Sequence, residues 1–201
     1  MKKYFFAAFP IAAIALASLK PVGEPLPIGA DIPQSTVKMK DISGSEVSFN
    51  DTKTDKGLVV MFSCNTCPVV KKYQSRTLEV CKYAKGMGLG VILLNSNEAT
   101  RGEGDSYDDM KAYAAEQHYF FNYVLDNHSA MADAFGANRT PEVYIFDKNG
   151  KLAYHGAIDD NMESPDVVTR KHAIIAIDEI LAGREVTQKL TRSVGCTIKR
   201  N

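Results

Sequence analysis

The strongest constraint on the fold is an apolar run that ends in a pair of cysteines. Residues 58–62 read Leu-Val-Val-Met-Phe, and after one serine residues 64–68 read Cys-Asn-Thr-Cys-Pro. An apolar run without polar alternation predicts a strand that is covered on both faces, as in a parallel sheet. From residue 69 to Met87, apolar residues recur at three- and four-residue steps, which predicts an amphipathic helix. The cysteines therefore lie where a buried strand gives way to a helix.

Strand and helix patterns alternate along the rest of the chain. Before the buried strand, alternating apolar residues on both sides of Gly44 predict a β-hairpin over 37–49. Later strands are predicted at 89–95, 123–125, 142–146 and 152–155, and later helices at 105–117, 129–135 and 167–181. This order predicts an α/β protein with a mixed central β-sheet flanked by helices and an N-terminal β-hairpin.

The chain is 201 residues long, and its first residues predict export. Lys2 and Lys3 precede an apolar run that ends in small residues at Ala17, which is typical of a secretory signal peptide over 1–17. An uncleaved anchor is the alternative, but the run is short for a membrane span, so no stable insertion is expected after cleavage. An extended lead-in is then expected over 18–33, and one domain over 34–201, in a periplasmic or other extracytoplasmic compartment.

The charge balance argues against a nucleic-acid partner. Lys plus Arg and Asp plus Glu both number 24, so the formal net charge is zero. A protein that binds nucleic acid through its phosphates usually presents a marked excess of basic residues.

The C-x-x-C pair predicts thiol–disulfide chemistry. A cysteine at the start of a helix has a lowered thiol pKa, because unpaired backbone N–H groups and the helix dipole stabilise the thiolate. We therefore expect an exposed Cys64 to attack a disulfide, and the more covered Cys67 to resolve the mixed disulfide. A static disulfide and half of a zinc site are the alternatives, and Cys81 and Cys196 are not spaced as a second pair of zinc ligands.

Thr140-Pro141 opens the strand at 142–146. A cis peptide bond there would turn the backbone of Thr140 toward a cleft, where it can pair with an extended substrate. An ordinary trans proline at a strand start is the alternative.

These residues together resemble the thioredoxin-like superfamily. More narrowly, the chain resembles the redoxin, or alkyl hydroperoxide reductase–thiol-specific antioxidant, type and its "peroxiredoxin-like" subgroup. The resemblance rests on segments 26–29, 46–49, 60–68, 139–143, 154–161 and 193–199. It implies a thioredoxin-like fold and a cis bond at Thr140-Pro141 facing Cys64. It also implies exchange with protein thiols or disulfides and a thiol electron donor, with no cofactor and no metal.

Two departures from the family bear on activity. Ser63 stands where many thioredoxins have Trp. The Pro and the Thr or Ser that precede a peroxidatic cysteine are replaced by Gly57 and Met61 when counted back from Cys64. When the same places are counted back from Cys67, they hold Val60 and Cys64. Because the Pro and the hydroxyl residue are missing in both cases, the alternative function of a thiol peroxidase is expected to be weak. The other alternative is a copper-binding metallochaperone of the Sco type, with His155 as the candidate distal ligand.

Four further features have open interpretations. Cys81 falls on the apolar face of its helix, which predicts a buried small hydrophobe or else a disulfide with Cys196. Cys196, in the C-terminal tail, is either an auxiliary third thiol or a packed residue. Arg139 contacts either a substrate or solvent. The acidic run 103–109 is interpreted as the solvated start of a helix.

Overall fold

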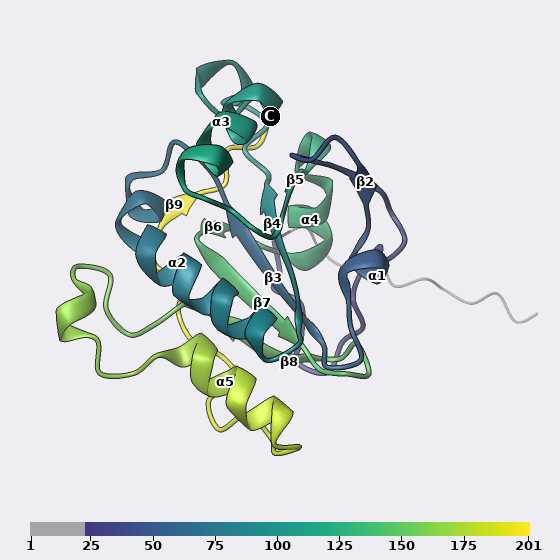
Figure 1. Ribbon diagram of the computed structural model, residues 1–201, viewed down its shortest axis with the longest axis vertical. Coiled ribbons are helices and arrows are strands. Elements are labelled where there is room, and N and C mark those ends of the chain that lie inside the picture. The colour runs from purple at the N-terminus through teal and green to yellow at the C-terminus, as the bar shows by residue number, and fades with distance from the viewer. Residues whose placement is uncertain (1–22) are drawn as a thin grey trace, which may run out of the picture.

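The computed structural model describes residues 23–201, and the predicted leader at 1–17 lies outside the described residues. The central sheet has seven strands in the order β2-β1-β5-β4-β3-β7-β8 (Figure 1). Its strands are β1 (Met39–Asp41), β2 (Glu46–Val47), β3 (Leu58–Ser63), β4 (Gly90–Asn95), β5 (Asn122–Leu125), β7 (Glu142–Phe146) and β8 (Leu152–Gly156). A separate two-stranded sheet joins β6 (Arg139–Thr140) to β9 (Cys196–Thr197). The helices are α1 (Phe49–Thr52), α2 (Pro68–Gly86), α3 (Tyr107–Glu116), α4 (Ala130–Phe135) and α5 (His172–Leu181).

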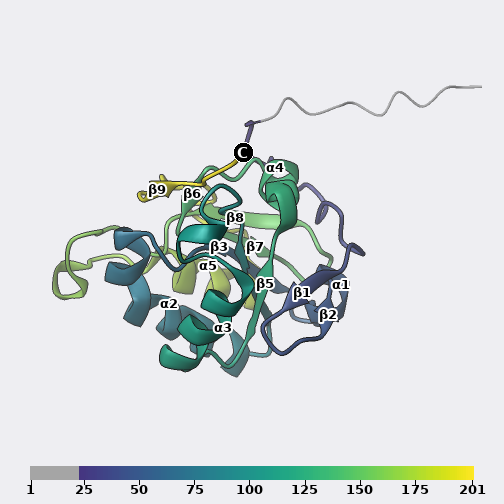
Figure 2. The same ribbon diagram turned by 90° about the horizontal axis from the view of Figure 1, so that it is seen from above.

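The sheet is mixed because its central strand pairs in both senses. β3 runs parallel to β4 and antiparallel to β7. Every residue of β3 and β4 is buried, as expected for strands covered on both faces. One face packs against α2, α3 and α5, and the other against α1 and α4. Figure 2 shows α2 and α3 on one side of the strands and α4 on the other. The predicted α/β class and flanked mixed sheet are confirmed.

Two predicted boundaries were wrong. The predicted hairpin forms, but Phe49 belongs to α1, because Ser48 and Asp51 cap this short helix reciprocally. The last helix begins at His172 and not at 167. Pro165–Val167 forms a separate 3₁₀ turn, and Val168 takes an extended conformation that interrupts the helix.

The described part of the lead-in packs on the domain. The Leu26 N–H donates to the carbonyl of Phe135, and both Leu26 and Ile32 are buried. Residues 23–201 contain no helix with the length and apolar character that crossing a membrane requires.

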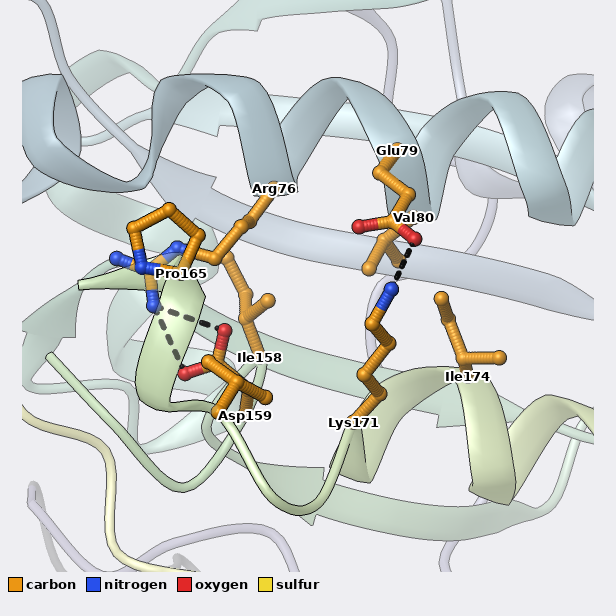
Figure 3. A pocket seen from close by; sticks show the side chains of 9 residues that line it. Arg76, Glu79, Val80, Ile158, Asp159, Pro165, Lys171 and Ile174 are labelled. Atoms are coloured by element: carbon orange, nitrogen blue, oxygen red, sulfur yellow. Dashed lines mark hydrogen bonds and ion pairs between the residues drawn. The ribbon is translucent and has the colours of Figure 1, made fainter.

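Polar contacts join α2 to the α5 region across a small surface pocket (Figure 3). Arg76 lines this pocket from α2 and donates to both oxygens of Asp159, at 3.0 and 2.9 Å. Lys171 pairs with Glu79 at 2.5 Å near the start of α5. These contacts fix α2, and therefore its first turn, relative to the rest of the molecule.

Candidate active site

The two cysteines of the C-x-x-C segment occupy different backbone positions. Cys64 follows the last residue of β3, outside the helix. Cys67 is the N-cap of α2, with Pro68 as the first helical residue. Cys67 is therefore nearest the start of the helix, but its side chain makes no capping hydrogen bond. The backbone N–H groups of Thr66 and Cys67 hydrogen-bond instead to Cys64 Sγ.

Cys67 is bonded to Cys196, with 6.1 Å between their Cα atoms. The sequence predicted that Cys64 and Cys67 form an exchange pair, and a disulfide between Cys81 and Cys196 was one of two interpretations of Cys81. Instead, Cys64 and Cys81 are both free and buried. Strand β9 explains this pairing, because it lies antiparallel to β6 and places Cys196 opposite Thr140, close to the start of α2 (Figures 1 and 2).

Cys64 is fully buried, which contradicts the expected exposed and partly ionised thiol. Burial raises the pKa of the Cys64 thiol above the usual value, and the charge of the Asp105 carboxylate raises it further. Hydrogen bonds from Thr140 and from the backbone of Cys67 and Thr66 act in the opposite direction without reversing the shift. The Cys64 thiol is therefore protonated at neutral pH.

Thr140 lies against both sulfurs. Its hydroxyl is 3.5 Å from Cys64 Sγ, and its carbonyl oxygen is 3.6 Å from Cys67 Sγ. The Thr140-Pro141 bond is cis, as the resemblance implied. Cys64 and Cys67 form one small buried cluster with Val70, against which Cys196 packs. Three cysteines thus meet at Thr140, Cys64 at its hydroxyl and Cys67 and Cys196 at its backbone.

Asp105 is a buried carboxylate that the sequence analysis missed. It is fully buried, although the run 103–109 was interpreted as the solvated start of a helix. Its oxygens accept the backbone N–H of Asn65 at 2.8 Å and the hydroxyl of Thr66 at 2.8 Å. Side chains of Asn95, Asn97 and Thr100 also donate to this carboxylate.

Burial alone would raise the pKa of Asp105, but these hydrogen bonds outweigh it and the net shift is downward. A sequence signal for this residue exists. Ser106 and Asp109 cap α3 reciprocally, so Asp105 precedes the helix and belongs to the loops at the carboxyl ends of β3 and β4.

The other candidate residues have defined surroundings. Arg139 is exposed and donates to the carbonyl of Gly195 at 3.2 Å. Cys81 is fully buried within the apolar layer between α2 and the sheet, as one of its two interpretations expected. His155 Nε2 lies 2.6 Å from Glu142 Oε1, and its ring stacks on Tyr144.

Within residues 23–201, no group of three or more His, Cys, Asp and Glu side chains is arranged to hold a metal ion.

Comparison with known proteins gives one family and several related structures. The model of the AhpC/TSA family matches residues 28–155. No curated protein matches the chain. An uncharacterized conserved protein from Geobacillus kaustophilus is 34% identical to this chain and has a TM-score of 0.81. The alignment covers 87% of this chain and 93% of that protein. A hypothetical protein from Sinorhizobium meliloti 1021 is 27% identical with a TM-score of 0.80, over 90% of this chain and 99% of its own.

A more distant structure shares the fold. The thioredoxin domain of a thiol-disulfide oxidoreductase from Bacteroides vulgatus is 23% identical, with a TM-score of 0.53. The alignment covers 65% of this chain and 88% of that domain. Together with the family match, this likeness confirms the thioredoxin-like fold.

Proposed function

Because this chain belongs to the AhpC/TSA family, we propose that it is a thiol–disulfide oxidoreductase that exchanges with protein substrates through Cys67 and Cys64. One observation carries the proposal: a disulfide at Cys67 lies beside the free thiol of Cys64, with both sulfurs against Thr140. This is the arrangement that a mixed disulfide and its resolving thiol require.

The surroundings of the two cysteines favour roles opposite to those expected from the sequence. Cys67 is the N-cap residue of α2, where the helix dipole favours a thiolate, and it is the cysteine of the pair that already forms a disulfide, so it is the nucleophile in this proposal. Cys64 is buried with a raised thiol pKa, so it is the resolving cysteine.

Reduction of a substrate then takes two steps. Both steps start after the thiol electron donor has reduced the Cys67–Cys196 bond and freed both thiols. The Cys67 thiolate then attacks one sulfur of the substrate disulfide, and the substrate S–S bond breaks as the Cys67–substrate bond forms. The displaced substrate sulfur leaves as a thiolate and takes a proton from solvent. Cys64 next loses its proton, attacks Cys67 Sγ and releases the second substrate thiolate, which leaves a Cys64–Cys67 disulfide. A thiol electron donor restores the two enzyme thiols, and the reverse sequence oxidises a substrate.

Export and domain boundaries complete the proposal. A leader over 1–17 would direct the lead-in and the domain over 34–201 to an extracytoplasmic compartment, where disulfides persist.

Insulin reduction with a thiol donor tests this function. We expect Cys67→Ser to abolish turnover, because Cys67 takes part in both steps. Cys64→Ser in a Cys196→Ser background, where the tail thiol cannot replace Cys64, should stop turnover after the first step and accumulate a mixed disulfide. Cys81→Ala is the matched control, since this buried cysteine lies outside the site, and it should keep its activity. Wild-type activity that survives in Cys67→Ser would refute the proposal. Peroxide consumption measured beside it tests the weak peroxidase alternative.

A further inference from the structure

We propose that the edge of β6 beside Cys67 binds an extended peptide in which glycine directly precedes the reacting cysteine, and that the chain's own C-terminal strand fills this site. The inference rests on the proposed exchange function and names its substrate class. It also makes the tail Gly195-Cys196-Thr197 a tethered competitor of external substrates.

Backbone pairing is the first support. Thr140 pairs with Cys196 and Arg139 with Thr197, so β9 is added to β6 as an antiparallel strand. Strand addition recognises a peptide through its main chain and leaves selectivity to the side-chain positions. Because Cys196 is also bonded to Cys67, the tail has the connectivity of a substrate held in a mixed disulfide.

Gly195 supplies the selectivity. A Cβ atom at this position would lie 2.1 Å from the carbonyl oxygen of Thr140 and 2.8 Å from its carbonyl carbon. Both atoms belong to the backbone of a fully buried residue that is followed by Pro141, so they cannot move aside as the end of a flexible side chain could. Arg139 meanwhile holds the carbonyl of Gly195 at 3.2 Å. Any residue other than glycine before the cysteine is therefore excluded from this geometry.

The second position after the cysteine is also defined. Ile198 is buried in the apolar layer around α4, and its N–H donates to the carbonyl of Asn138 at 3.1 Å. The neighbouring Lys199 N–H donates to Asn97 at 3.0 Å. The favoured peptide is therefore Gly-Cys, then any residue, then an apolar residue.

The tail competes because it covers the nucleophile. Cys67 is only 4% exposed with β9 in place. An external peptide reaches Cys67 after the Cys67–Cys196 bond is reduced and β9 leaves β6.

The first test compares two activated peptides on the full-length Cys64→Ser/Cys196→Ser variant, in which Cys67 is the only cysteine of the site. The peptides are Ser-Val-Gly-Cys-Thr-Ile-Lys and the same sequence with alanine before the cysteine. Each carries a thionitrobenzoate leaving group on its cysteine, so attack by Cys67 releases the coloured thiolate and leaves a Cys67–peptide disulfide. We expect the glycine peptide to react at least about tenfold faster. Equal rates would overturn the inference.

The second test does not depend on turnover. Gly195→Ala should shift the ratio of reduced to oxidised glutathione at which the Cys67–Cys196 disulfide forms by at least about tenfold. The reason is that β9 can no longer pair with β6. Gly86→Ala is the matched control, since a Cβ at this exposed end of α2 meets no atom within 4 Å. An unchanged ratio in Gly195→Ala would overturn the inference. Insulin reduction by the wild type is scored separately, so failure of the proposed function is distinguished from failure of the peptide selectivity.

Discussion

The carboxylate of Asp105 accepts the backbone N–H of Asn65 at 2.8 Å, and this bond ties the loop between the two cysteines to the segment before α3. The amide of the same Asn65 side chain donates to the carbonyl of Gly104, and its oxygen accepts the hydroxyl of Tyr123. The loop is therefore held from two elements that lie far from it in the sequence. A buried network of this kind fixes a geometry only while each of its members keeps a partner.

Asp105→Asn should destabilise the reduced protein by about 2–4 kcal/mol, because an amide nitrogen would face donors in place of an acceptor. Urea unfolding measures this loss. Asp108→Ala, at a highly exposed position in the first turn of α3, is the control and should change the stability by less than about 0.5 kcal/mol. The variant should also lower the pKa of Cys64, since the negative charge beside that thiol is removed. A Cys64 pKa that stays the same would contradict the described role of this charge.

The contribution of Asp105 should depend on pH in the acid range. Its pKa is lower in the folded protein than the usual value of about 3.9 in an unfolded chain. The stabilisation is therefore fully present above pH ~4 and is lost as the pH falls through the folded pKa. Unfolding measured at a series of pH values should show the gap between wild type and Asp105→Asn narrowing below pH ~4. A constant gap would mean that the carboxylate does not titrate differently on folding.

Thr140→Val should slow the second step of exchange. The variant keeps the branched shape but removes the hydroxyl that lies 3.5 Å from Cys64 Sγ and lowers the pKa of that thiol. We expect release of the reduced substrate to be roughly 2–10-fold slower at neutral pH, because one hydrogen bond is lost. The midpoint of the release rate plotted against pH should also move upward. Single-turnover release against pH measures both effects. Thr140→Ser keeps the hydroxyl and should restore the wild-type profile, and a profile unchanged in Thr140→Val would exclude this role.

Cys81 should matter for stability and not for exchange. Burial raises the pKa of the Cys81 thiol, which packs among apolar side chains between α2 and the sheet. Cys81→Ser buries a hydroxyl without a partner there and should cost about 1–3 kcal/mol. Cys81→Ala places no polar group in the core and should cost less. Unfolding and insulin reduction should be compared for both variants, and a loss of turnover in the alanine variant would place Cys81 in the mechanism.

The fold could be predicted from the sequence because its signals are local. The apolar run of β3, the helical spacing after Pro68 and the alternation around Gly44 each specify one element without reference to distant residues. The cysteine pairing could not be predicted in this way. Cys67 and Cys196 are 129 residues apart, and only the pairing of β9 with β6 brings them together.

The electrostatics of the site escaped prediction for a related reason. A cysteine after a buried strand and before a helix suggests an ionised thiol. Cys64 is instead fully buried, with Cys196 packed against its cluster, and burial together with the charge of Asp105 raises its pKa. The acidic run 103–109 is also expected to be exposed to solvent when only the local sequence is considered. Its member Asp105 becomes buried because donors converge on it from two separate segments, the Asn65-Thr66 loop and the end of β4 at Asn95.

The order of the two cysteines in the reaction is tested most directly by locating the trapped substrate. Each of Cys64→Ser and Cys67→Ser is made in a Cys196→Ser background, so that the tail thiol can neither block Cys67 nor capture the peptide. Each is incubated with a disulfide-containing peptide, and tandem mass spectrometry identifies the protein cysteine that carries it. We expect a stable adduct on Cys67 in Cys64→Ser and little adduct in Cys67→Ser, where the remaining Cys64 thiol is buried and protonated. An adduct on Cys64 in Cys67→Ser, with none on Cys67 in the other variant, would contradict this account.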